Sequence, residues 1–179
     1  MKKITKYVDF LPFDLLNELQ DFANDVNKME TDSVDQFTIN KVRWEDEIVK
    51  ESTPVKIYYA NDDNIIINKV REEITNKTGW IADGPMMLYF WSVGSYIPWH
   101  NDGATKAGFT LYLNDFWDKD WGGLFLYEYG VDDTIIGITP EENIAVLQEY
   151  NVDHAITTIN KDANVRITLQ TFFFEKLEQ

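Results

Sequence analysis

The sequence contains no cysteine among its 179 residues. That absence excludes disulfide bonds, thiolate metal ligands and cysteine nucleophiles. A chain without cysteine fits a reducing compartment, so we predict a cytoplasmic protein. Long apolar runs are also missing, because none approaches the roughly 20 residues that a membrane-spanning helix needs. The charged residues 1–7 are not followed by an apolar stretch, and no signal peptide is predicted.

Basic residues are scarce relative to acidic ones. The chain has 16 Lys and Arg against 31 Asp and Glu, which gives a formal net charge of −15. Such a chain repels phosphate backbones, because nucleic-acid affinity comes largely from basic side chains that displace counterions. We therefore predict no nucleic-acid partner. The acidic excess either attracts a basic partner or only maintains solubility, and the sequence leaves both interpretations open.

The chain has no internal repeat, no low-complexity tract and no Pro/Gly/Ser linker, which predicts a single domain over residues 1–179. Within it, residues 1–84 are expected to form a helical support with one strand at 55–59. A first helix should begin after Pro12 and a second should end near Gly79. Their apolar faces comprise Leu15, Leu16, Leu19, Phe22, Ala23 and Val26 in the first, and Ile65, Ile66, Ile67, Val70 and Ile74 in the second.

From residue 85 to residue 175 the pattern changes to short aromatic or β-branched runs separated by turn residues. Eight strands at this spacing indicate a sandwich or jelly roll rather than βαβ units. The predicted fold class is mainly β with supporting helices (α+β), a barrel-like core on which N-terminal helices pack. The eight expected strands span roughly 86–92, 96–101, 108–114, 123–129, 134–138, 143–149, 154–159 and 165–174.

His100 and Asp102 are the first candidates for chemistry. In an extended segment residues i and i+2 point the same way, so this imidazole and carboxylate can converge on one metal ion. The chain has only one other histidine, His154, which lies on a separate predicted strand. Two histidines and one carboxylate with open positions are the ligand set of non-haem iron(II) oxygenases. A zinc hydrolase can use the same three ligands, and His-x-Asp alone is a weak motif.

Arg166 adds a second feature twelve residues after His154. Strand alternation places Arg166 and Thr168 on one face of an otherwise apolar strand. A buried guanidinium needs an anion, and its fork of donors suits a carboxylate. One interpretation is a salt bridge to an acidic side chain. The other is a seat for a dicarboxylate co-substrate.

The stretch from Tyr112 through Asn114 to Asp118, followed by Gly122-Gly123-Leu124, resembles the 2-oxoglutarate-dependent prolyl hydroxylases. The likeness is greatest to the oxygen-sensing and ribosomal-protein prolyl hydroxylases and covers about residues 86–175. It implies a double-stranded β-helix, the jelly-roll or cupin-like fold. It also implies that His100, Asp102 and His154 bind iron(II). Arg166, helped by the hydroxyl of Tyr112, would bind the distal carboxylate of 2-oxoglutarate.

Further contacts to the co-substrate are implied less directly. The resemblance gives Thr168 a hydroxyl contact, as the Arg-x-Ser/Thr pairing has in related oxygenases. These hydroxylases often carry a tyrosine shortly before the glycine that corresponds to Gly94, and Trp91 is the nearest match here. Tyr89 shares the strand face of Trp91, so both residues are candidates for this contact.

The activity implied is hydroxylation of an unactivated C–H bond, with release of succinate and CO2. The expected substrate is a prolyl residue in a protein or peptide, which the acidic chain would favour in a basic, proline-containing segment; ascorbate is a candidate auxiliary reductant. Trp99 has the opposite parity to His100 and is expected at an entrance, whereas residues 172–174 are expected to pack in the core. The alternatives are an oxygenase acting on a free amino acid or other small molecule, a nucleic-acid demethylase, which the charge disfavours, and a non-catalytic jelly-roll binding module.

Overall fold

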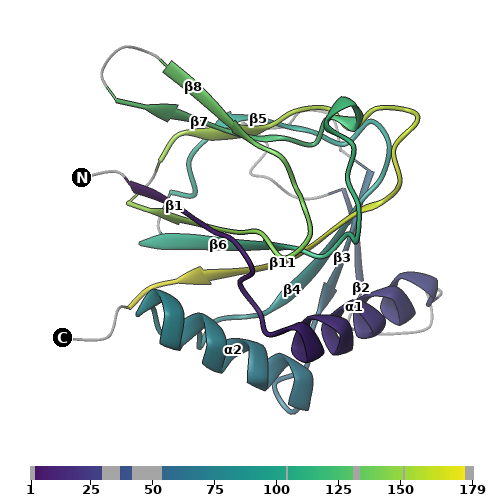
Figure 1. Cartoon of the computed structure of the whole chain (residues 1–179), viewed down its shortest axis with the longest axis vertical. Coiled ribbons are helices and arrows are strands. Elements are labelled where there is room, and N and C mark those ends of the chain that lie inside the picture. The colour runs from purple at the N-terminus through teal and green to yellow at the C-terminus, as the bar shows by residue number, and fades with distance from the viewer. Residues whose placement is uncertain are drawn as a thin grey trace.

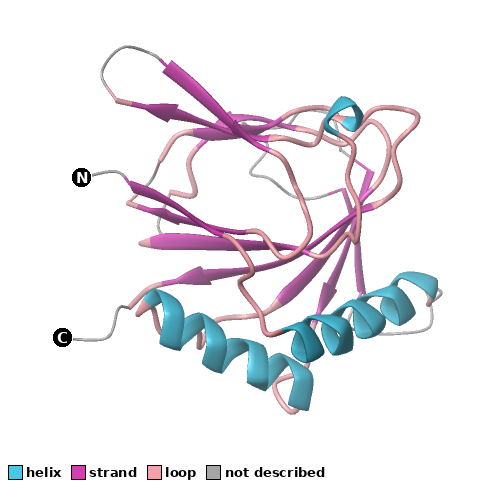
Figure 2. Cartoon of the chain, in the orientation of Figure 1, coloured by secondary structure: helices cyan, strands magenta, loops and turns pink. Residues whose placement is uncertain are grey.

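The computed structural model describes residues 3–29, 37–41, 54–103, 105–130, 134–150 and 152–175. Two β-sheets face each other, and two helices cover the outer side of the larger sheet (Figures 1 and 2). The larger sheet has the strand order β1–β9–β6–β11–β4–β3–β2, and the smaller sheet has the order β5–β10–β7–β8. The strands are β1 (Lys3–Tyr7), β2 (Phe37–Lys41), β3 (Pro54–Tyr59), β4 (Met87–Trp91), β5 (Ile97–His100), β6 (Ala107–Tyr112), β7 (Phe125–Tyr129), β8 (Thr134–Ile138), β9 (Ala145–Glu149), β10 (His154–Ile156) and β11 (Arg166–Phe173).

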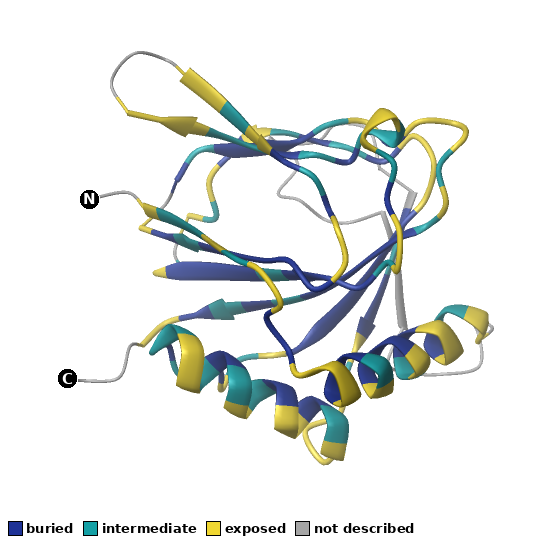
Figure 3. Ribbon diagram, in the orientation of Figure 1, coloured by how far each residue is buried: buried dark blue, intermediate teal, exposed yellow. Residues whose placement is uncertain are grey.

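The larger sheet separates two layers of packing because successive side chains of a strand point to opposite faces. On β11, Ile167 and Leu169 join the cluster that includes the buried faces of the helices. Arg166 and Gln170 instead line a pocket on the face that looks toward the smaller sheet. The space between the two sheets is therefore where polar side chains can converge inside the protein. Figure 3 shows that the central strands of the larger sheet are buried, whereas β7 and β8 of the smaller sheet are more exposed.

As predicted, the helix α1 (Phe13–Lys28) begins directly after Pro12 and the helix α2 (Ile65–Thr78) ends at Gly79. The side chain of Asn64 accepts hydrogen bonds from the first backbone N–H groups of α2. Gly79 ends α2 in the left-handed conformation, with φ 73°, which costs glycine little because it has no Cβ. In the described part of the chain, no helix is both long enough and apolar enough to cross a membrane.

The predicted fold class and the two helices are confirmed, as are the strand at 55–59 and the eight strands after residue 85. The strand expected at 154–159 is shorter, ending at Ile156. The prediction missed β1 and β2, which complete the two edges of the larger sheet. Both are five-residue segments whose role depends on a distant partner: β1 pairs with β9, and β2 pairs with β3.

Candidate metal centre and anion pocket

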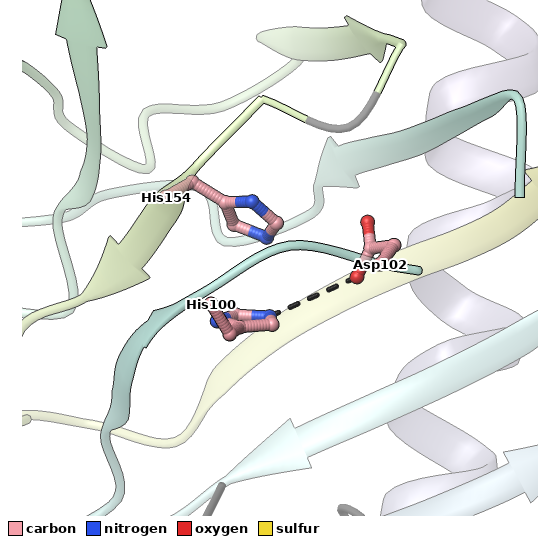
Figure 4. Close-up of side chains that lie close together, drawn as sticks. All are labelled: His100, Asp102 and His154. Carbon is pink, nitrogen blue, oxygen red and sulfur yellow. Dashed lines mark ion pairs between the residues drawn. The ribbon is translucent and has the colours of Figure 1, made fainter. Parts of the chain in front are cut away.

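His100, Asp102 and His154 converge at the edge of the smaller sheet (Figure 4). His100 ends β5, Asp102 lies in the turn that follows, and His154 begins β10 directly opposite His100. One ligand atom from each residue lies within 4.8 Å of the others. The Nε2 atom of His100 is 3.7 Å from Oδ1 of Asp102. The antiparallel pairing of β5 with β10 thus unites two histidines that the sequence places on separate strands.

Both imidazoles are held in the same tautomer by the backbone. Nδ1 of His100 lies 2.8 Å from the carbonyl oxygen of Pro98, and Nδ1 of His154 lies 2.9 Å from that of Val152. A carbonyl oxygen can only accept, so each Nδ1 must carry the hydrogen. Each Nε2 then keeps its lone pair for a metal ion. Such hydrogen bonds commonly fix metal-binding histidines.

The surroundings of His154 favour the neutral imidazole that a metal requires. Burial lowers the pKa of His154, with Asp102 partly offsetting the effect and His100 adding to it. The ring of Phe125 stacks on the ring of His154, with centroids 5.1 Å apart. Because neutral histidine is the ligand form, this centre is prepared for a cation without first releasing a proton from His154.

Asp102 has a partner that the sequence did not reveal. Its Oδ2 atom accepts a hydrogen bond from Nε2 of Gln148 on β9. Gln148 lies 46 residues away in sequence. Nothing in the local pattern of residues 143–149 distinguishes it from any other alternating polar residue of a strand.

A pocket runs between the sheets from this centre to Arg166. It encloses about 410 Å³ of space outside the protein atoms, its open mouth included. Phe172 lines the pocket and packs against the apolar cluster between the sheets, and Phe173 is fully buried, whereas Phe174 is 51% exposed, so the expected core packing of residues 172–174 is wrong for Phe174. Trp99, beside His100, is 43% exposed, as its parity predicts. The lining comprises Ile97, His100, Asp102, Gly108, Phe109, Thr110, Phe125, Gln148, His154, Ile156, Arg166, Gln170 and Phe172.

Arg166 is fully buried, and its three guanidinium nitrogens have no hydrogen-bond partner among the described residues. Its charged group lies over two rings, 5.0 Å from the centroid of Tyr112 and 5.4 Å from that of Trp91. No acidic side chain of the described residues forms an ion pair with it, which rules out the salt-bridge interpretation among them. Burial lowers the pKa of Arg166 and the adjacent hydroxyl of Tyr112 partly offsets this, so a cation persists here best beside an anion. The hydroxyl of Tyr112 is buried and, like the guanidinium, is in direct hydrogen-bond geometry with no described residue.

The other predicted co-substrate contacts lie next to Arg166 in the larger sheet. Thr168 is paired with Tyr112 on one side and with Tyr89 on the other. Its hydroxyl oxygen accepts hydrogen bonds from Nε1 of Trp91 at 3.2 Å and from Nε2 of Gln170 at 3.3 Å. The hydroxyl of Tyr89 lies 3.7 Å from the sulfur of Met87, and burial raises the pKa of Tyr89. Thr168 and Trp91 therefore form a hydrogen-bonded layer around Arg166, whereas the hydroxyl of Tyr89 is turned toward sulfur.

Two residues of the stretch after β6 shape the space around Arg166. Asn114 donates to the carbonyl oxygen of Val165 at 2.8 Å and accepts from the N–H of Ile167 at 2.7 Å. It thereby holds the backbone on both sides of Arg166. A Cβ on Gly123 would lie 3.1 Å from Cδ of Arg166. The chain can therefore pass this close to the guanidinium stem because position 123 has no side chain.

Known proteins were compared with the chain at the level of sequence and of structure. No protein-family model matches the sequence, and no curated protein matches it. Among solved structures, a prolyl-4-hydroxylase from Pseudomonas putida superposes with a TM-score of 0.69 at 17% identity, covering 100% of this chain and 95% of the other. A prolyl hydroxylase from Trichoplax adhaerens, bound to a peptide fragment of the hypoxia inducible factor oxygen degradation domain, gives 0.71 at 14% identity, covering 96% and 83%.

A third protein with the same fold catalyses a different reaction. The epimerase SnoN, in complex with Fe³⁺, alpha ketoglutarate and nogalamycin RO, gives a TM-score of 0.70 at 10% identity, covering 97% of this chain and 79% of the other. The chain has the fold of the 2-oxoglutarate- and iron-dependent oxygenases. The predicted double-stranded β-helix is thus confirmed. Because this oxygenase fold serves more than one reaction, the activity of the chain has to be argued from its own residues.

Proposed function

We propose that the chain is an iron(II)- and 2-oxoglutarate-dependent dioxygenase that hydroxylates an unactivated C–H bond. The observation that supports this most is the buried guanidinium of Arg166, which has no partner in the described part of the chain and lies in the same pocket as the histidine–aspartate group. An uncompensated buried cation costs free energy, so a site that keeps one is built for an anionic ligand. A zinc hydrolase would use the three ligands but leave Arg166 and Tyr112 without a role.

The residues present fit both groups. His100, Asp102 and His154 would hold iron(II) through two neutral nitrogens and one carboxylate oxygen. Arg166 would bind the distal carboxylate of 2-oxoglutarate, with the hydroxyls of Tyr112 and Thr168 beside it. Bound iron(II) would supply the activation of dioxygen.

In the net reaction, one oxygen atom enters the substrate C–H bond and the other enters succinate, while 2-oxoglutarate loses CO2. The protein contributes by orienting the reactants and by excluding water from the pocket. Burial of Arg166 keeps the anion site dry, and the apolar walls of Ile97, Phe125 and Ile156 shield the reacting centre. Ascorbate would serve only to keep the iron reduced.

The metal centre is tested by titrating the purified apoprotein with Mn(II). We expect one ion per chain, and loss of binding in His154→Ala, because each of the three residues supplies a direct bond. Succinate release from 2-oxoglutarate should require iron(II) and dioxygen and should stop under argon. If metal binds tightly but no candidate substrate or uncoupled turnover yields succinate, the chain is a binding module with the oxygenase fold.

For the substrate, we propose a prolyl residue within a protein or peptide. Support comes from the sequence resemblance and from the structural likeness to prolyl hydroxylases, one of which holds a peptide. The exposed ring of Trp99, next to His100 on β5, is available to contact an extended chain. A proline-containing segment loses little backbone entropy on binding. The alternative is a small molecule, for which SnoN with its bound nogalamycin RO is the structural precedent.

Succinate release should separate the two substrate classes. Proline-rich peptides with basic flanks should stimulate it, and mass spectrometry should show a gain of one oxygen atom on proline. Free L-proline and a panel of amino acids are the comparison. Stimulation by free amino acids with every peptide inert would defeat the peptide proposal while leaving the oxygenase proposal intact.

A further inference from the structure

We infer that Gln148 is a positioning residue that holds Asp102 so that only one of its carboxylate oxygens is offered to the metal. The inference rests on the proposed metal centre and adds to it a residue that no motif indicates. Gln148 is not itself a ligand, because its amide nitrogen, which faces Asp102, donates and has no lone pair to share.

The two oxygens of Asp102 face different partners. Oδ1 lies 3.7 Å from Nε2 of His100. Oδ2 accepts the hydrogen bond from the amide of Gln148. The amide therefore occupies the oxygen that would otherwise be free to swing onto the metal as a second bond.

The strand arrangement makes this contact possible. Gln148 on β9 is paired directly with Gly108 on β6, and its side chain lies over that glycine. A Cβ at position 108 would lie 2.8 Å from the amide nitrogen of Gln148 and 3.1 Å from Oδ2 of Asp102. Gly108 is not among the residues with positive φ. Its missing side chain therefore serves to leave room for the amide and the carboxylate to meet.

The consequence concerns the number of free positions on the metal. Two imidazoles and a carboxylate bound through one oxygen occupy three positions, which leaves the others open for co-substrate and dioxygen. A carboxylate bound through both oxygens would take one of them. An amide suits the task because it donates to the carboxylate without adding a charge beside the metal.

The test replaces the amide while keeping the shape of the side chain. Gln148→Met has nearly the same length and no donor. We expect its affinity for Mn(II) to fall about 10- to 100-fold, as is typical for loss of a hydrogen bond to a metal ligand. The visible spectrum of the Co(II)-loaded protein should also change, because the coordination of Asp102 changes. The melting temperature of the apoprotein should shift by less than about 3 °C.

The matched control is Gln20→Met. Gln20 is a buried glutamine on α1 whose amide donates to the carbonyl oxygen of Leu113 at 3.0 Å. Its replacement should lower the melting temperature and leave the Mn(II) affinity and the Co(II) spectrum unchanged. If Gln148→Met binds Mn(II) as tightly as the wild type while His154→Ala does not bind it, the role of Gln148 is refuted and the metal centre stands. If the wild-type protein itself binds no divalent metal, both proposals fall.

A second variant tests the role of Gly108 independently. Gly108→Ala should displace the amide of Gln148 and weaken Mn(II) binding in the same direction. The double variant with Gln148→Met should then be no weaker than Gln148→Met alone, because both changes break one interaction. Additive losses would show that Gly108 acts elsewhere and would overturn this part of the inference.

Discussion

Arg166 has no contact with solvent, and none of the described acidic side chains neutralises it. The rings of Trp91 and Tyr112 offer only their π faces, which attract a cation by about 0.5–2 kcal/mol. That attraction is smaller than the cost of leaving five N–H donors without acceptors. At the scale of single residues, this imbalance is the clearest sign that the pocket receives an anion.

Removing the guanidinium should therefore weaken the binding of 2-oxoglutarate. Arg166→Ala should raise the KM for 2-oxoglutarate by about 30- to 900-fold, which corresponds to about 2–4 kcal/mol for a lost charge-assisted contact. Arg166→Lys should recover only part of this, because an ammonium cannot reproduce the planar fork. Tyr112→Phe should show a smaller rise. Steady-state succinate release measures all three, and an unchanged KM in Arg166→Ala would remove Arg166 from the site.

At the scale of elements, the position of Arg166 depends on the connection between β6 and β11. Asn114 follows β6 and bonds to the backbone on both sides of Arg166. The amide of Asn114 takes the place of a neighbouring strand where β11 begins. It thereby fixes the position from which the guanidinium of Arg166 extends into the pocket. The resemblance to prolyl hydroxylases included Asn114 without assigning it a task, and the structure supplies one.

Asn114→Ala should raise the KM for 2-oxoglutarate about 10-fold, because lost order at β11 misplaces the guanidinium, while Mn(II) affinity stays within about 2-fold of the wild type. Stability should fall by about 1–3 kcal/mol, since a buried N–H loses its acceptor. Asn64→Ala is the control, because it also removes two side-chain hydrogen bonds, both of them accepted by Asn64 at the start of α2. Asn64→Ala should lower the stability by about 0.5–2 kcal/mol and leave the KM for 2-oxoglutarate and the Mn(II) affinity unchanged. Equal KM effects in the two variants would mean that general destabilisation explains both.

At the scale of the whole molecule, the net charge of −15 acts on any charged partner before contact. Such a field attracts basic segments over roughly a Debye length, about 10 Å at 0.1 M salt. The anion pocket works against this field, because it must bind a dicarboxylate inside an acidic protein. Burial resolves the conflict, since a contact between Arg166 and a carboxylate inside the protein is strong at short range and is screened by salt far less than contacts between surface groups are.

Salt should therefore change the KM for a basic peptide more than the KM for 2-oxoglutarate. For a proline peptide with basic flanks, KM should rise several-fold between about 50 and about 300 mM NaCl, because screening weakens the attraction. The KM for 2-oxoglutarate should change much less over the same range. A peptide with acidic flanks is the control and should bind better, not worse, as salt increases. Salt-independent capture of the basic peptide would show that the acidic excess serves only solubility.

The elements of this protein were predictable because their signals are local. The period of the apolar residues defined both helices, and alternation placed Arg166 with Thr168 on one strand face and turned Trp99 outward. The two-residue repeat also suggested that His100 and Asp102 converge, although Asp102 lies in the turn just after β5. These inferences need only the geometry of a few consecutive residues, so no knowledge of the tertiary structure was required.

Other features were decided by the order of the strands. The edges formed by β1 and β2, the pairing of His154 with His100, the contact of Gln148 with Asp102 and the absence of an acidic partner at Arg166 among the described residues all join segments distant in sequence. The sequence of a strand does not identify its pairing partner, because apolar and polar residues alternate in the same way at every position in a sheet. By itself the sequence determined both helices, the strands other than β1 and β2, and the three candidate metal ligands. Only the folded arrangement decided that no described acidic side chain pairs with Arg166 and which glutamine meets Asp102.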